Sequence, residues 1–185
     1  PQRRLDTLPY AAAVFRAIMN RTKIKKVVVS AGGVREGLLY RALSQKERKL
    51  DPLLEGARFF AGRLSPEPEI GPAVEEMTAP LFPKETAAQR RMRTTACLLS
   101  DIGAYFHPDL RAMQAYQTAL RAPFYGITHK ERVSIAMSLH VRHDGRPPAQ
   151  IDDHLIDLLT DEERGDSLRL GLAMRFAGAL APKAP

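Results

Sequence analysis

Two places in the sequence combine residue types and spacing that could support phosphate or metal chemistry, and the first is Ser30-Ala-Gly-Gly-Val-Arg-Glu-Gly37. Its glycines allow another group to approach the backbone closely, and a helix that starts after such a turn offers free N–H groups to an anion. The glycine spacing matches neither the Walker pattern nor the dinucleotide-binding pattern, so a purely structural turn with an Arg35–Glu36 ion pair is the alternative. The segment is a candidate phosphate-binding turn.

The second place is Cys97-Leu-Leu-Ser-Asp-Ile-Gly103, together with His107 and two later histidines. Asp101 follows an apolar helical run, so its carboxylate needs a partner or a ligand. His140 and His143 are three residues apart, which would place both on one helical face as a possible metal pair. His140 also continues the apolar pattern of its helix, so a buried structural histidine is the alternative.

Other residues with chemical potential have simpler interpretations. Arg90, Arg91 and Arg93 lie within one helical turn and cannot all point inward, so they are expected to form a solvated face with some capacity to bind phosphate. The single cysteine, Cys97, excludes an intrachain disulfide and a CxxC metal site, and its apolar surroundings predict a core position. One cysteine also fits a reducing cytoplasm.

The composition limits the classes of partner. The chain has 185 residues, a formal net charge of +7 and an isoelectric point near 9.8, which favours anionic partners. Aromatic residues make up only 6% and no zinc-finger or RNP-type motif is present, so nucleic acid is not the expected partner. No apolar run approaches the roughly 20 residues of a membrane span, so no membrane association is expected.

The elements that would position these residues change in type near residue 44. The pattern predicts a helix over 8–20, a buried strand over 26–30 and a second helix after Gly37, which is α/β organisation. Beyond this point the pattern is all-helical, with breaks at proline and glycine. Helices are expected over 45–64, 71–79, 85–101, 109–120, 129–143, 149–154 and 161–180.

Two details of this helical part can be checked directly. Ser44 and Glu47 have the spacing of a capping box at the start of the first helix. Leu168, Leu172 and Phe176 have helical spacing and should mark the buried face of the last one.

Two motifs resemble the exopolyphosphatase / guanosine pentaphosphate phosphatase family. Residues 26–40, Lys-Val-Val-Val-Ser-Ala-Gly-Gly-Val-Arg-Glu-Gly-Leu-Leu-Tyr, are similar to the strand and turn that end the family's actin-like lobe, and residues 96–103 to the "LHDIG" segment of its helical domain. Residues 122–143 resemble later segments of that domain. The resemblance implies a mainly α fold: an HD-like helical domain over 45–185, preceded over 1–44 by a small α/β remnant of an actin-like (ribonuclease H-like) phosphatase lobe.

The resemblance also implies a function. A full-length parent would hydrolyse terminal phosphoanhydride bonds of polyphosphate or guanosine pentaphosphate with Mg²⁺, using a carboxylate on a lobe that precedes this chain. No catalytic residue and no bound cofactor are therefore expected here. The fragment would itself be inactive and cytoplasmic, contributing substrate binding and homodimerisation. By similarity to actin-like folds, the turn would line the substrate end of the cleft through Gly32, Gly33, Arg35, Glu36 and Gly37.

The helical domain departs from the metal-dependent HD phosphohydrolases at the position of their metal site. Ser100 stands where a histidine ligand would be, and a hydroxyl is a poor replacement for a neutral imidazole donor. A single histidine, His107, is present where relatives carry several. The resemblance therefore implies a degenerate HD-like site that holds no metal, formed by Ser100, Asp101, His107, His140 and His143.

Two functions of other classes stay open at the level of sequence. One is a self-sufficient HD-like metal phosphohydrolase that uses Asp101, His107, His140 and His143 as ligands. The other is a helical interaction module that has no substrate.

Overall fold

The computed structural model describes residues 2–27, 32–149 and 153–180, and the regular structure within these ranges is helical, without a strand. The chain divides into two compact units, Pro1–Gly37 and Leu38–Pro185. The mainly α fold expected from the sequence is therefore confirmed. The domain boundary expected after residue 44 stays a prediction.

The first unit contains α1 (Gln2–Thr22) and the start of α2 (Val34–Ala42). Apolar side chains of α1, including Leu8, Val14 and Phe15, are exposed. The buried strand predicted over 26–30 lies largely outside the described residues, and the two of its positions that are described, Lys26 and Val27, have no regular structure. The prediction of a strand is therefore untested.

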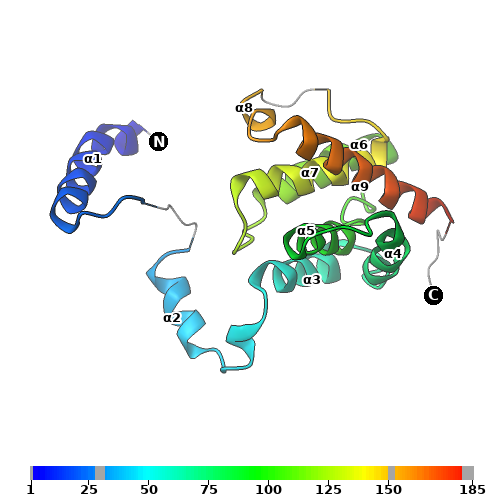
Figure 1. Cartoon of the computed structure of the whole chain (residues 1–185), viewed down its shortest axis with the longest axis horizontal. Coiled ribbons are helices and arrows are strands. Elements are labelled where there is room, and N and C mark those ends of the chain that lie inside the picture. Colours follow the sequence, from blue (N-terminus) through cyan, green and yellow to red (C-terminus); the bar gives the residue numbers. More distant parts are fainter. Residues whose placement is uncertain (1, 28–31, 150–152, 181–185) are drawn as a thin grey trace. The chain divides into compact units, whose positions relative to one another are not determined.

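The second unit is a bundle of helices, drawn in Figure 1 from cyan to red. Its elements in chain order are η1 (Glu47–Lys49), α3 (Pro52–Leu64), α4 (Ile70–Thr78), η2 (Ala79–Leu81), α5 (Ala87–Leu98), α6 (Pro108–Arg121), α7 (His129–Asp144), α8 (Asp153–Ile156) and α9 (Asp161–Leu180). None of the described helices is long and apolar enough to cross a membrane.

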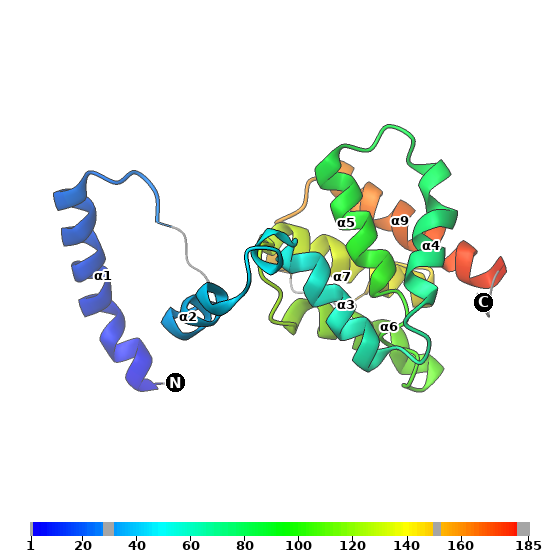
Figure 2. The same ribbon diagram turned by 90° about the horizontal axis from the view of Figure 1, so that it is seen from below.

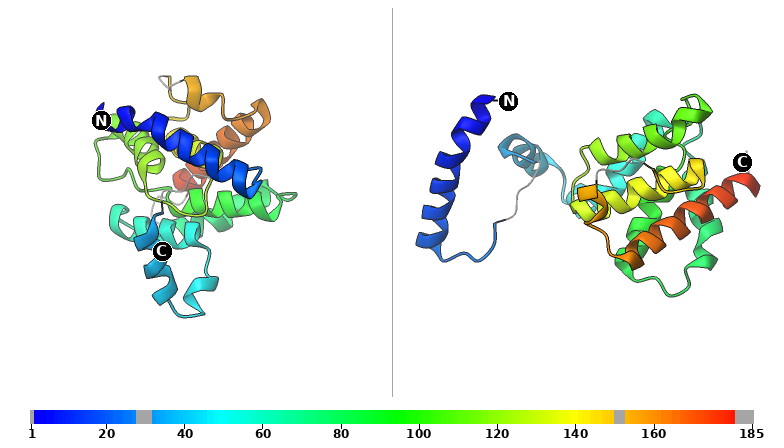
Figure 3. Two further views of the ribbon diagram at one scale, coloured as in Figure 1. Left: turned by 90° about the vertical axis from the view of Figure 1, so that its left-hand side faces the viewer. Right: turned by 90° about the horizontal axis from the view of Figure 1, so that it is seen from above.

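These helices form two layers. One layer contains α3, α4 and α5, and the other contains α6, α7 and α9, as Figures 1 and 2 show. α7 packs against α6 on one side and α9 on the other, and Figure 3 shows α9 running beside it. The layers meet where α5 contacts α7 and where α4 contacts α9.

Side-chain caps explain where several helices begin. Thr86 and Gln89 form a capping box at the start of α5, and Thr128 and Glu131 form another at the start of α7. At its other end, α7 stops at Gly145, whose φ of 85° lies in the left-handed region that glycine adopts without strain. The start of α5 and both ends of α7 are thus determined by residues that lie next to them in the sequence.

The continuous helix predicted over 45–64 is wrong, because the structure has two separate elements there, η1 and α3. Ser44 and Glu47 do make the reciprocal bonds of a capping box, at 2.8 and 3.2 Å, but only the short η1 turn comes after it. Pro52 lacks an N–H and disfavours helical geometry in the residue before it, so the helix restarts there as α3. Asp51 caps this new start by accepting a bond from Leu53 N at 2.9 Å.

The core is continuous through both layers of the second unit. α7 contributes its most complete run of buried positions, from Ile135 to Val141. The buried apolar set includes Leu53, Ile70, Val74, Leu99, Ile102, Tyr116, Phe124, Leu139 and Met174. Cys97 is fully buried within this set, so its predicted core position is confirmed.

The predicted buried face of α9 is wrong. Leu172 and Phe176 are 44% and 61% exposed, whereas α9 buries Gly171, Met174 and Ala177. A Cβ built on Gly171 would lie 2.5 Å from Val141 Cβ, so the two helices meet through small side chains rather than through the largest ones. The apolar spacing identified the helix but not the face that it buries.

Candidate functional site

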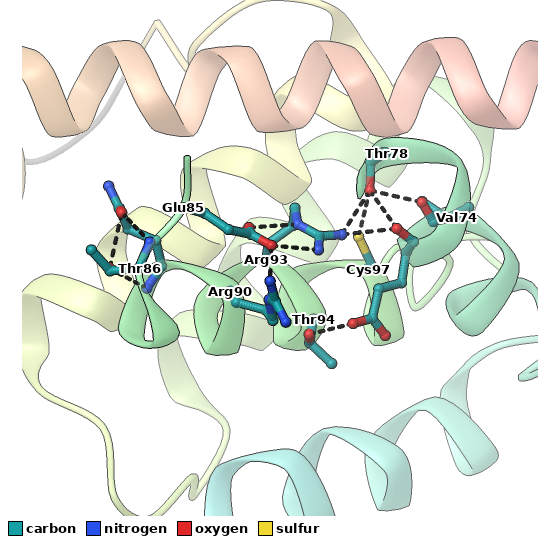
Figure 4. Close-up of polar contacts among 10 residues, drawn as sticks. Val74, Thr78, Glu85, Thr86, Arg90, Arg93, Thr94 and Cys97 are labelled. Carbon is teal, nitrogen blue, oxygen red and sulfur yellow. Dashed lines mark hydrogen bonds and ion pairs between the residues drawn. The ribbon is translucent and has the colours of Figure 1, made fainter. Parts of the chain in front are cut away.

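A buried polar network crosses the layer of α4 and α5, and Figure 4 shows its contacts. Arg93 on α5 donates from Nε and Nη2 to the two carboxylate oxygens of Glu85, both at 2.8 Å. Its Nη1 donates to Glu75 O at 2.8 Å and to Thr78 Oγ1 at 3.2 Å. Because the side chains of Arg93 and Glu85 are only 6% and 7% exposed, this is a buried ion pair with its remaining hydrogen bonds supplied by the protein.

Cys97 lies at the inner end of the same network. Its Sγ is 3.7 Å from Thr78 Oγ1, and Thr78 in turn donates to Val74 O at 2.8 Å (Figure 4). Burial raises the pKa of the Cys97 thiol to about 12. A thiol that stays protonated is a poor nucleophile, so Cys97 has a structural role.

The expectation of a solvated arginine face is wrong for two of its three members. Arg93 is buried, and Arg91 is bound to the Asp51 carboxylate and donates to Gly126 O at 2.8 Å. Arg90 alone remains outside, 67% exposed, and it touches Glu85. The carboxylates of Glu85, just before α5, and Asp51, 40 positions from Arg91, thus occupy the guanidinium groups that phosphate would need.

A cavity of about 600 Å³ lies beside this network, between α5, α7 and α9. Three ion pairs within the protein involve its lining: Arg93 with Glu85, Lys130 with Glu163 at 2.6 Å, and Arg169 with Asp166 at 3.1 Å. Lys84, Glu131 and Glu162 also line the cavity and form no ion pair among the described residues. The apolar part of the lining comes from Leu81, Phe82, Met92, Leu159 and Leu170. The cavity has volume for a small molecule, and the three ion pairs offset much of the charge on its walls.

The HD-like position lies in the loop after α5, beside the last turn of α7, whereas the cavity is lined by residues of the first half of α7. Asp101 Oδ1 is 3.8 Å from Nη2 of Arg142 on α7, and the Asp101 side chain is 18% exposed. Burial raises the pKa of Asp101, while Arg142 and Arg111 oppose that rise. The partner that the sequence required for Asp101 is therefore a cation of the protein, and sequence reasoning did not identify it.

His143 stands next to Arg142 and is uncharged. Burial lowers the pKa of His143 to about 3, and the charges of Arg142, Arg111 and Arg175 add to this shift. Its Nε2 is buried and has no hydrogen-bond partner among the described residues. The three guanidinium groups would repel a metal ion, so the surroundings of this imidazole are unfavourable for a metal ligand.

The remaining members of the predicted site lie in separate settings. His140 is buried, with Nδ1 2.9 Å from Arg146 O and its ring edge-on to Tyr116, as a structural histidine would be. His107 is exposed and caps α6 by accepting from Asp109 N at 3.4 Å. Ser100 is fully buried, and its Oγ has no partner within the described ranges.

Gly103 explains how the loop reaches α6 and α7. A Cβ built on Gly103 would lie 2.9 Å from Arg111 O and 3.4 Å from His143 Nε2. Only glycine allows this approach, which brings Asp101 to the end of α7. Across the described part of the chain, no three His, Cys, Asp or Glu side chains gather in a way that could hold a metal ion.

The glycine turn has its own internal bonds. Gly33 N donates to Glu36 Oε2 at 2.7 Å, and Gly37 N donates to Gly33 O at 3.1 Å. Glu36 therefore caps the start of α2, and an anion binding there would have to replace this carboxylate. Arg35 is exposed, and Gly32 is half-buried. The assignment of Gly32, Gly33, Arg35, Glu36 and Gly37 to substrate stays a prediction.

Comparison with known proteins adds a family to this geometry. The family model described as "Exopolyphosphatase, C-terminal" matches residues 76–185. Retrograde regulation protein 2 of Saccharomyces cerevisiae is 28% identical over 189 residues, which cover 92% of this chain and 29% of that protein. The chain thus spans less than a third of the length of this relative. Because the family model covers more than half of the chain, and agrees with the motifs found in the sequence, the chain belongs to the exopolyphosphatase C-terminal family.

Proposed function

We propose that this chain forms the C-terminal part of a phosphatase that acts in the cytoplasm and hydrolyses the terminal phosphoanhydride bonds of inorganic polyphosphate or guanosine pentaphosphate. The match of residues 76–185 to the exopolyphosphatase C-terminal family carries the proposal. The net charge of +7 supports it, since a basic surface raises the local concentration of a polyanion.

In this proposal the chain binds substrate, and a carboxylate and Mg²⁺ elsewhere in the parent perform the hydrolysis. The residues at the HD-like position support that division, because they do not suit a divalent cation. Asp101 lies beside Arg142, and the neutral His143 is surrounded by arginines. The glycine turn over 32–37 would line the substrate end of the parent's active site.

The proposal includes self-association of the chain into a dimer. α9 leaves three large apolar side chains outside the core: Leu172, Phe176 and Leu180 are 44%, 61% and 61% exposed. Covering such side chains with a second copy would remove them from water. Sedimentation velocity should therefore give a dimer, and Phe176→Asp should shift the chain toward monomer. A monomer at all concentrations would contradict this part.

Assays of phosphate release and polyphosphate binding test whether this chain binds substrate without hydrolysing it. The purified chain, incubated with polyphosphate and Mg²⁺, should release no orthophosphate above the rate in buffer. It should still bind polyphosphate, with an affinity that falls as salt is added, because added ions screen exposed charges. Mg²⁺-dependent turnover by the chain alone would refute the assignment of catalysis to another part. A lack of binding at low salt would favour a helical interaction module.

Elemental analysis separates the proposal from a self-sufficient metal phosphohydrolase. We expect the purified chain to hold no stoichiometric transition metal, and His143→Ala to leave the metal content unchanged. One equivalent of metal that is lost in His143→Ala would support the metal enzyme instead.

A further inference from the structure

Three guanidinium groups gather at the HD-like position, one from each helix of the second layer. They belong to Arg111 on α6, Arg142 on α7 and Arg175 on α9. Arg175 donates to His143 O, and Arg142 Nη2 lies 3.8 Å from Asp101 Oδ1. The backbone of Arg111 meets Gly103 beside His143, since a Cβ on Gly103 would lie 2.9 Å from Arg111 O and 3.4 Å from His143 Nε2. All three positive charges act on His143. Because three helices converge here, residues from well-separated parts of the sequence form one cluster, which we call the arginine cluster.

Negative charge near the arginine cluster is scarcer than positive charge. Asp101 approaches Arg142 only to 3.8 Å, which is an ion pair without a hydrogen bond. The other carboxylate that acts on Asp101 is Glu67, and its side chain is exposed. Among the described residues, Asp101 is therefore the carboxylate that forms an ion pair with the cluster, and water screens the charge of Glu67.

Of the three arginines, Arg142 has the least hydrogen bonding to offset the burial of its positive charge. Its side chain is 14% exposed, its Nε is buried, and among the described residues its guanidinium donates no hydrogen bond. Its neighbours are better provided, since Arg111 Nε donates to Phe106 O at 2.9 Å and Arg175 Nη1 donates to His143 O at 2.5 Å. A largely buried guanidinium that has lost its water and gained no acceptor is costly, and an oxyanion would supply acceptors.

We propose that the arginine cluster binds a phosphate group of an oligophosphate chain. Planar guanidinium groups match phosphate oxygens in pairs, and the low exposure of Arg142 would strengthen those bonds. The inference deepens the proposed function and rests on it, since it assigns substrate binding to particular side chains. The phosphate can come from inorganic polyphosphate or from a nucleoside polyphosphate, which share this phosphoanhydride chemistry.

Calorimetric titration at low ionic strength, with inorganic tripolyphosphate as the probe, tests the cluster. Arg142→Gln and Arg111→Gln should each weaken binding by about tenfold, the loss expected for one charge-assisted interaction. The matched control is Arg121→Gln, which removes the same charge from the exposed C-terminal end of α6 and should change binding by less than about twofold.

Asp101→Asn supplies a change of opposite sign. It removes the carboxylate that competes for Arg142 and should tighten tripolyphosphate binding by a few-fold, about the effect of one nearby charge. A purely structural role for the arginines would not produce weaker binding in one variant and tighter binding in the other. Thermal unfolding of each variant checks the fold, and the half-buried Arg111 keeps the test available if Arg142→Gln does not fold.

The outcomes separate this inference from the proposed function. Equal weakening by all three arginine variants would indicate diffuse attraction and overturn the inference, while the proposed function would stand. Binding of long polyphosphate without binding of tripolyphosphate would also overturn the inference and leave the proposed function standing. Failure to bind either ligand would overturn both. A parallel titration with GTP identifies the source: similar affinities for both probes indicate recognition of the phosphates alone, whereas much tighter GTP binding indicates a nucleoside polyphosphate.

Discussion

Arg93 and Glu85 illustrate what single side chains contribute in this molecule. Two parallel hydrogen bonds of 2.8 Å join them, and neither side chain is more than 7% exposed. Because both side chains are buried, water cannot solvate one charge if the other is removed. Each charge is therefore stabilised mainly by its partner. The neighbouring Arg90 is 67% exposed and makes one bond of 3.1 Å to the same carboxylate.

Removing Arg93 should therefore be far more costly than removing Arg90. Arg93→Gln leaves the Glu85 carboxylate buried without its main partner, and we expect the free energy of unfolding to fall by about 3–5 kcal/mol. Arg90→Gln should change it by less than about 1 kcal/mol, as for an exposed pair. Urea titration measures both. Equal effects of the two variants would contradict the buried ion pair.

Glu85 also predicts how stability responds to acid. Hydrogen bonds from Arg93 lower the pKa of Glu85 below its ordinary value of 4.5. The unfolded chain therefore binds the proton first, so this contribution is fully present above about pH 4.5 and is lost as the pH falls through the lower folded-state pKa. Glu85→Gln should flatten the decline of unfolding free energy below pH 4.5, measured by urea titration at several pH values. An unchanged slope would argue against the lowered pKa.

Sequence reasoning predicted part of this residue-scale chemistry. It required a partner for Asp101, and the structure provides one. It also stated that Arg90, Arg91 and Arg93 cannot all point inward, which holds for Arg90, but the solvated face inferred from this is wrong for Arg91 and Arg93. It did not predict Arg142 as the partner of Asp101, because the packing of helices decides which residue of another helix lies there. It also missed Glu85, which lies just before α5 and only eight positions from Arg93. Arg142 lies in the sequence between the candidate ligands His140 and His143. This position was the signal that could have identified Arg142 as the partner of Asp101.

Among the glycines of the described helices, Gly171 marks the closest approach of two helices, that of α7 and α9. A Cβ on Gly171 would lie 2.5 Å from Val141 Cβ and 2.7 Å from Ser138 O. Beside this contact, Ser138 Oγ donates to Ser167 O at 3.0 Å. Absence of a side chain on α9 thus determines how near the two helices can approach.

Two glycines of α9 should respond in opposite ways to the same substitution. Gly171→Ala forces the helices apart and should lower the free energy of unfolding by about 1–3 kcal/mol, the usual cost of overpacking. Gly165→Ala meets nothing within 4 Å and should raise it by about 0.5–1 kcal/mol through helix propensity. Urea titration of the two variants compares them within one helix. Stabilisation by Gly171→Ala would show that the helices can separate without loss.

The helices themselves were well predicted, because caps and periodicity are local signals. The buried face of α9 was predicted wrongly. Leu168, Leu172 and Phe176 show where large apolar residues recur along the helix, but the contact with α7 forms where small residues allow the two helices to approach. The continuous helix over 45–64 failed for a related reason. Ser44 and Glu47 did form their capping box, but Pro52 ends the short turn after it and starts a separate helix.

For the whole molecule, the described core belongs to the second unit. Its buried apolar residues run from Leu53 to Ala177, and none of those described in the first unit is buried. Since burial of apolar surface is the main source of stability, the second unit holds what is needed to fold.

A chain of residues 38–185 should therefore fold alone. We expect its midpoint of thermal unfolding, followed by circular dichroism, to equal that of the 185-residue chain within error. A transition that becomes broad, or a midpoint that falls by more than about 5 °C, would mean that the first unit stabilises the second.

The bonds of Arg91 have a consequence for how quickly the molecule comes apart. They join α5 to Asp51 and Gly126, which are 40 and 35 positions away in the sequence. Contacts that close such long loops tend to form after the chain has largely collapsed, so they stabilise the native state more than the folding transition state. Stopped-flow measurements on Arg91→Gln should show faster unfolding with a nearly unchanged refolding rate, and slower refolding would contradict this order. Arg91 would then act chiefly on the lifetime of the folded state.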